Sequence, residues 1–96
     1  MELRHLRYFC AVAEHHGFSS SARALNISQS AISEQISDLE LEIGVTLLVR
    51  GQKETRLTEQ GEVFLTEAKK VLLAADLAVE DVEFFIVGTD DGVIEI

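Results

Sequence analysis

Residues 27–37 read ISQSAISEQIS, and this stretch decides the fold because it predicts a helix with one apolar and one polar side. Ser28 is a residue type that caps helix starts, and Gly44 is one that ends helices. At about 100° per residue, one side is an apolar stripe of Ile32, Ile36, Leu39 and Ile43. The opposite side carries short or charged polar residues, namely Ser30, Ser33, Glu34 and Ser37. Such a helix presents an unobstructed polar face.

Two shorter helices are predicted before it. In residues 3–15, apolar side chains recur with the i, i+3, i+4, i+7 spacing of one helical face, and Gly17 is expected to end that helix. Residues 19–25, SSSARAL, predict a short second helix with a serine cap. Asn26 tolerates the left-handed conformation and is expected to turn the chain towards Ser28.

A small wing and a long helix are predicted after it. Residues 47–58, LLVRGQKETRLT, indicate two short strands around a turn at 51–53, with Arg50, Lys53 and Arg56 as a local basic concentration. Thr58 is expected to cap a long helix that Gly88 closes. Its apolar residues alternate in steps of three and four, which predicts a dimer seam of Leu65, Ala68, Leu72, Ala75, Val79, Val82 and Ile86.

These elements predict a mainly α fold: a winged helix-turn-helix of three helices plus a two-stranded wing, followed by a long dimerisation helix. The winged domain is expected at residues 1–58, with the helix-turn-helix at about 18–37 and the wing at about 47–58. Residues 59–87 form the linker helix in this interpretation. Residues 88–96 end in GVIEI, which alternates like a strand and is interpreted as the hinge and the start of a missing effector-binding domain.

The net charge of −9 disfavours binding to nucleic acid, but this charge is distributed unevenly along the chain. Residues 1–60 hold six Lys and Arg against eight Asp and Glu, giving −2, whereas residues 61–96 hold two against nine, giving −7. The acidity therefore lies mostly in the predicted linker helix and beyond. A DNA-binding face in the first part would have only weak long-range attraction for phosphate.

Several other functional classes find little support. No apolar run of 18 residues predicts a membrane span, and the N-terminus lacks a signal-peptide pattern. Cys10 is the sole cysteine, on an apolar helical face, and is interpreted as a small buried hydrophobe. His15 and His16 are adjacent and point apart, so surface histidines are expected, with no metal site. Without a phosphate loop or a nucleophile beside a base, the sequence predicts no enzyme and no cofactor in this chain.

The sequence resembles the N-terminal part of LysR-type transcriptional regulators over about residues 1–87. The resemblance rests on the opening ELRHLRYF, on SQSAISEQISDLELEIG and on the closing LTEQG. It implies a bacterial, cytoplasmic regulator that dimerises through the long helix, usually assembles into tetramers and binds inverted repeats in double-stranded promoter DNA. It also implies that a small-molecule effector is bound by the missing C-terminal domain.

The same resemblance implies which residues contact DNA. The third helix would lie in the major groove, with Ser28, Gln29, Ser30, Ser33 and Glu34 as contacts. Gln29 suits adenine, and Ser33 suits a base edge or a phosphate. Arg50 and Lys53 would reach a phosphate or the minor groove from the wing. A solvated polar face and an ordinary charged turn are the plain alternatives.

Two positions depart from the family pattern: most relatives have proline in place of Ser30 and arginine in place of Glu34. A carboxylate near a phosphate is repelled, so three interpretations of Glu34 stay open. It accepts a hydrogen bond from cytosine N4, it turns aside while the wing supplies affinity, or the protein binds DNA poorly. The last corresponds to an alternative function, a winged-helix protein-interaction module that acts through (hetero)dimerisation.

Overall fold

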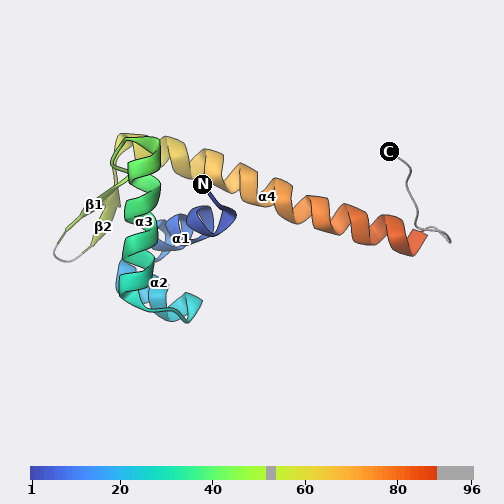
Figure 1. Ribbon diagram of the computed structural model, residues 1–96, viewed down its shortest axis with the longest axis horizontal. Coiled ribbons are helices and arrows are strands. Elements are labelled where there is room, and N and C mark those ends of the chain that lie inside the picture. Colours follow the sequence, from blue (N-terminus) through green and yellow to red (C-terminus); the bar gives the residue numbers. More distant parts are fainter. Residues whose placement is uncertain (52–53, 89–96) are drawn as a thin grey trace.

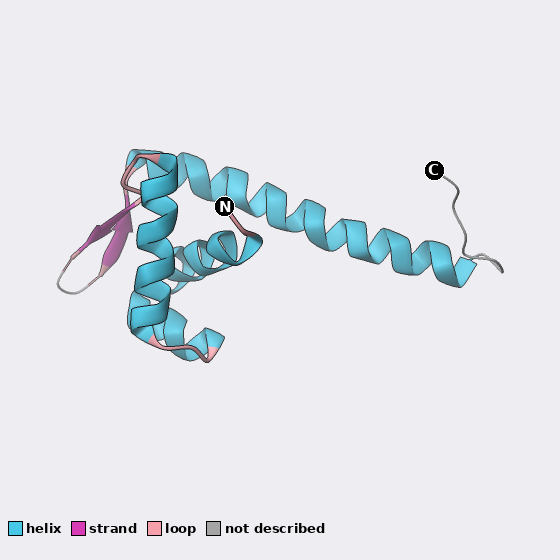
Figure 2. Cartoon of the chain, viewed as in Figure 1, coloured by secondary structure: helices cyan, strands magenta, loops and turns pink. Residues whose placement is uncertain are grey.

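The computed structural model describes residues 1–51 and 54–88, except for the side chains of 86–88, and it confirms the predicted fold class. The elements are α1 (Leu3–His15), α2 (Phe18–Leu25), α3 (Gln29–Ile43), β1 (Leu48–Arg50), β2 (Thr55–Leu57) and α4 (Glu59–Gly88). Helices α1 to α3 pack together with the two-stranded wing beside them, and α4 projects away from this group (Figures 1 and 2). The predicted strand at 92–96 lies outside the described residues.

The turn between α1 and α2 differs from the sequence prediction in two respects. The residue that leaves α1 in the left-handed conformation is His16, with φ 56°, whereas Gly17 is extended at φ 176°. The predicted serine cap of α2 is also absent, because α2 begins one residue earlier and Gly17 occupies the cap position. Ser21 is instead fully buried, and its hydroxyl donates to the Gly17 carbonyl at 2.7 Å.

Helix α3 has the predicted caps at both ends. The Ser28 hydroxyl accepts a hydrogen bond from the Ala31 N–H at 3.1 Å, and Gly44 closes the helix at φ 85°. Ile32, Ile36 and Leu39 of the apolar stripe are buried. Ile43 was expected to continue the stripe, but as the last residue of α3 it is 37% exposed.

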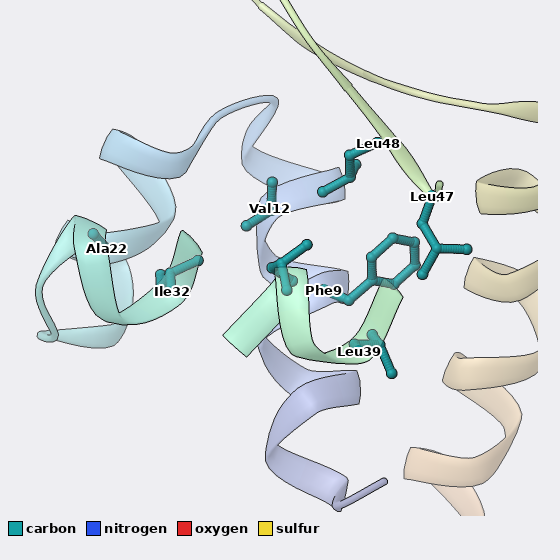
Figure 3. Packing of buried hydrophobic residues seen from close by; sticks show 8 residues of the cluster. Phe9, Val12, Ala22, Ile32, Leu39, Leu47 and Leu48 are labelled. Atoms are coloured by element: carbon teal, nitrogen blue, oxygen red, sulfur yellow. The ribbon is translucent and has the colours of Figure 1, made fainter. Parts of the chain in front are cut away.

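The main core lies where α1, α2 and α3 meet the start of the wing. Figure 3 shows Phe9 and Val12 of α1 facing Ile32 and Leu39 of α3. Leu47 and Leu48 close the cluster from the wing side, and the Phe9 ring meets Phe64 of α4 edge-on with 5.4 Å between centroids. Each such fully buried side chain contributes about 1.5–3 kcal/mol of hydrophobic stabilisation.

The wing is a short antiparallel pair that joins α3 to α4. Leu48 pairs with Leu57 and Arg50 with Thr55. The Thr58 side chain holds the junction: its hydroxyl donates to the Thr46 carbonyl at 2.7 Å and accepts from the Gly61 N–H at 2.9 Å. Thr58 thus caps α4, as predicted, and ties its start to the loop between α3 and β1.

Helix α4 begins against the winged domain and then leaves it. Its early part forms a second cluster with α1, in which Ala68 is 2% exposed and packs with Leu6 and Cys10, while Leu65 and Leu72 lie beside them. Burial raises the pKa of the Cys10 thiol, in keeping with the predicted small hydrophobe. Ala68, placed in the dimer seam by the sequence, is therefore covered by its own chain. Val79 and Val82 remain exposed, and the Ile86 side chain lies outside the described residues.

Gly61 is the position in α4 where a larger residue should be least tolerated. A Cβ at Gly61 would lie 2.0 Å from the Leu47 carbonyl oxygen, so Gly61→Ala must push α4 away from the wing. We expect the free energy of unfolding, measured by urea denaturation, to fall by about 3 kcal/mol or more. The matched control is Gly17→Ala, whose Cβ would meet only Ser20 Oγ at 3.5 Å, and we expect a change of about 0.5 kcal/mol at most. Equal losses in the two variants would contradict this account of the junction.

Candidate nucleic-acid interface

The polar side of α3 is open to solvent, as the sequence predicts. Ser28, Gln29, Ser30 and Glu34 are exposed, and Ser33 is half-buried. Ser30, Ser33 and Glu34 lie on the side of α3 away from Ile32 and Ile36, whereas Ser28 and Gln29 stand at its N-terminal end. All five predicted helix contacts are therefore at least partly accessible. Of the predicted wing contacts, Arg50 is described, and Lys53 lies outside the described residues.

The start of α3 offers hydrogen-bond donors. Beyond the Ser28 cap to Ala31, the first N–H groups of a helix have no partner within it. The Ser28 and Ser30 hydroxyls lie 3.4 Å apart, so Ser30 adds a second hydroxyl beside the cap. Arg23 at the end of α2 lines the hollow next to Ser28 and Gln29. Sequence reasoning did not include Arg23, although a basic residue one turn before the predicted cap was the available signal.

Glu34 carries an accessible carboxylate. It is exposed, and within residues 1–51 and 54–85 it has neither a hydrogen bond nor an ion pair. An unpaired exposed carboxylate can accept hydrogen bonds from amino groups, but it repels phosphate. The face is therefore suited to contact with base edges at Glu34 and to contact with anions at the helix start.

Arg50, which the resemblance implies is a phosphate or minor-groove contact, lies against α3. Its guanidinium donates to the Ser33 hydroxyl at 3.2 Å and to the Ser37 hydroxyl at 3.1 Å. The same group lies 4.8 Å from the centroid of the Phe18 ring and 3.8 Å from a Glu40 oxygen. Its side chain is 42% exposed, so positive charge remains at the surface between α3 and the wing.

Glu40 anchors the beginning of the wing to α3. One carboxylate oxygen accepts from the Leu47 N–H at 2.7 Å and from the Leu48 N–H at 3.3 Å, and the other lies near Arg50. These backbone groups would otherwise be partly buried without a partner. The Glu40 side chain therefore fixes the position of the wing relative to the polar face of α3. Helical periodicity does not predict this role.

Other kinds of site find no support in the described part of the chain. No cluster of three or more His, Cys, Asp or Glu side chains there has the geometry to hold a metal ion. None of its helices is both long and apolar enough to cross a membrane. His15 and His16 are exposed, and His5 accepts a hydrogen bond from the Glu2 N–H at 3.0 Å.

Residues 3–62 match the model of a protein family described as bacterial regulatory helix-turn-helix protein, lysR family. Over 80 residues, or 83% of this chain, it is 48% identical to the HTH-type transcriptional regulator AlsR of Bacillus subtilis and 49% identical to BudR of Klebsiella aerogenes. These alignments cover 26% of AlsR and 56% of BudR, so the chain spans between a quarter and about half the length of these relatives.

Solved structures similar to this one include DNA complexes. The crystal structure of a BenM_DBD/benA site 1 DNA complex superposes with a TM-score of 0.88 at 42% identity, covering 93% of this chain and all of that one. Full-length CbnR complexed with its target DNA superposes with a TM-score of 0.83 at 37% identity, covering 86% of this chain and 29% of that one.

Glu40→Ala should loosen the wing. It leaves the Leu47 and Leu48 N–H groups without their acceptor and removes the carboxylate near Arg50. We expect the free energy of unfolding to fall by about 2 kcal/mol, with a smaller loss for Glu40→Gln, which keeps one acceptor oxygen. Asp38→Ala is the control, because the Asp38 side chain is exposed and makes no hydrogen bond or ion pair within the described residues. Urea denaturation in which Asp38→Ala costs as much as Glu40→Ala would refute the anchoring role.

Proposed function

The chain belongs to the lysR family of bacterial regulatory helix-turn-helix proteins, and we propose that it binds promoter DNA as the DNA-binding part of a transcriptional regulator. The observation that carries the proposal is the accessible polar face of α3, with free donors at the helix start and a wing fixed beside it. This face fits a major groove, which admits one α-helix. The DNA complexes of similar domains support DNA binding.

The residues of this face suit particular contacts. The Gln29 amide can pair with the N6 and N7 atoms of adenine, and Glu34 can accept from cytosine N4. The helix start and Arg23 are placed for phosphate contacts, which fix the register of the protein on the duplex. We therefore favour a base-reading role for Glu34 over one in which its carboxylate turns aside.

We propose that the chain binds DNA as a dimer whose contact is the far part of α4. Past Leu72, none of the apolar side chains that the structure describes belongs to either core cluster, and Val79 and Val82 stand exposed. Two winged domains would then read an inverted repeat. Because the relatives are much longer, tetramer assembly, an effector response and a cytoplasmic location are expectations for the whole protein. The relatives are transcriptional regulators, so we expect no catalytic activity of this part.

The net charge of −9 and the carboxylate of Glu34 favour a second candidate, a protein-interaction module that forms mixed dimers without binding DNA. The two candidates differ in how affinity for DNA depends on salt. Binding through phosphates releases counterions and weakens as salt rises, whereas an interaction module shows dimerisation alone.

The test starts with selection of bound sequences from a randomised duplex library, followed by fluorescence anisotropy on the selected duplex and a shuffled control. If a dimer neutralises about four phosphates, affinity should fall about a hundredfold from about 50 mM to about 200 mM salt. Glu34→Gln should lower discrimination at one base pair about tenfold, and Glu34→Arg should change the preferred base there. Binding by Glu34→Arg without any binding by the native chain would favour the interaction module.

The dimer proposal predicts that Val79→Glu and Val82→Glu produce monomers, because each places a charge in the seam. Leu73→Glu is the matched control on the other side of α4. In the single chain these side chains are equally exposed, at 58%, 58% and 59% respectively, so only a partner can distinguish them. Sedimentation equilibrium should show monomers for both valine variants and dimers for Leu73→Glu. Dimers in all three variants would refute the predicted seam.

A further inference from the structure

Arg50 joins the wing to the exposed face of α3 through two hydroxyls one helical turn apart. One terminal nitrogen donates to Ser33 at 3.2 Å and the other to Ser37 at 3.1 Å. The guanidinium is fixed on its other sides by the Phe18 ring and the Glu40 carboxylate. A planar fork held at four points has little freedom to reach elsewhere. Arg50 is therefore placed to orient the two serines.

The contact settles what the serine hydroxyls can do. A hydroxyl has one donor and two acceptor lone pairs, and Arg50 can only donate, so each serine oxygen acts towards it as an acceptor. Serine and threonine in helices commonly donate back to the preceding turn, as Thr66 does to the Glu62 carbonyl and Ser21 to the Gly17 carbonyl. Within the described residues, neither Ser33 nor Ser37 makes such a bond. Their protons therefore remain available to an outside acceptor.

We propose that Arg50 is a positioning residue for DNA reading: by donating to Ser33 and Ser37, it makes Ser33 a dedicated donor towards acceptor atoms on base edges. This inference rests on the proposed DNA-binding function. The acceptors in the major groove are purine N7, guanine O6 and thymine O4. Ser33 then selects an acceptor atom, while the neighbouring Glu34 selects an amino group. A fixed donor beside a fixed acceptor discriminates between base pairs better than two hydroxyls that can each either donate or accept a hydrogen bond.

The test compares variants that keep the charge. Arg50→Lys retains the positive charge but loses the planar fork, which one ammonium cannot replace. Arg56→Lys is the matched control, because the Arg56 side chain is exposed on β2 and makes no hydrogen bond or ion pair within the described residues. Ser33→Ala and the double variant Arg50→Lys/Ser33→Ala complete the cycle. The probe is the selected duplex and a set in which each base pair is changed singly, measured by anisotropy at two salt concentrations.

We expect Arg50→Lys and Ser33→Ala to lower discrimination about tenfold at the same base pair, the double variant to lose no more, and Arg56→Lys to match the native chain. The salt dependence should be unchanged in all four. Replacing the purine N7 at that base pair with carbon should remove the difference between native chain and Ser33→Ala where N7 is the acceptor read.

Several outcomes would overturn the inference alone while leaving native DNA binding intact. One such outcome is that Arg50→Lys discriminates between base pairs as well as the native chain does. Another is that the losses of discrimination in the two single variants multiply in the double variant. Uniform weakening on every duplex by Arg50→Ala, with a smaller salt dependence, would make Arg50 a phosphate contact instead.

If Arg50→Lys unfolds the wing, Ser37→Ala decides the question, because it removes one of the two acceptors of the Arg50 fork. We expect Ser37→Ala to lower discrimination about threefold, and no loss would refute the proposal. Absence of specific binding by the native chain would overturn the proposed function and this inference together.

Discussion

The structure depends on how a single residue, Leu47, is held from three sides. Its N–H donates to Glu40 of α3 at 2.7 Å, and its carbonyl accepts from the Thr58 N–H at 3.0 Å. Its side chain is buried with Phe9 in the core, and Gly61 of α4 passes so close to its carbonyl that no Cβ fits between them. The backbone at Leu47 thus fixes α3, the wing and α4 relative to one another. The LTEQG motif acquires a physical meaning here: threonine caps and bridges, and glycine permits the close approach.

Local features of this chain were predictable because their causes are local. Ser28 and Gly44 bracket α3 with a side-chain cap and a left-handed glycine, and both effects act within a few residues. The start of α2 was predicted less well, because a run of three serines suggested a cap. In the structure Gly17 takes that place, and Ser21 instead donates its hydroxyl to the Gly17 carbonyl from inside the core. Competition between capping and burial cannot be decided from residue types alone.

The parts of the site that sequence reasoning missed are contacts between residues far apart in the chain. The resemblance implied that Arg50 contacts a phosphate or the minor groove, and it gave no sign that Arg50 also bonds residues 13 and 17 positions earlier. Helical periodicity likewise placed Ala68 in the seam, since a heptad pattern does not distinguish packing on one's own α1 from packing on a partner. The heptad pattern identifies which face of the helix is buried. Only the tertiary structure shows which element covers that face.

Rigid attachment of α4 has a consequence for the proposed dimer. A helix of 30 residues is about 45 Å long, and its first turns cannot swing while Gly61 and Thr58 hold it against the wing. Pairing between the far parts of two such helices would therefore determine the distance between the two copies of α3. Successive major grooves on one side of B-DNA lie about 34 Å apart. The spacing between the two half-sites would therefore be set by α4 and not by the polar face of α3. Affinity and spacing are then separable: the first depends on α3 and the wing, and the second on the junction at Leu47.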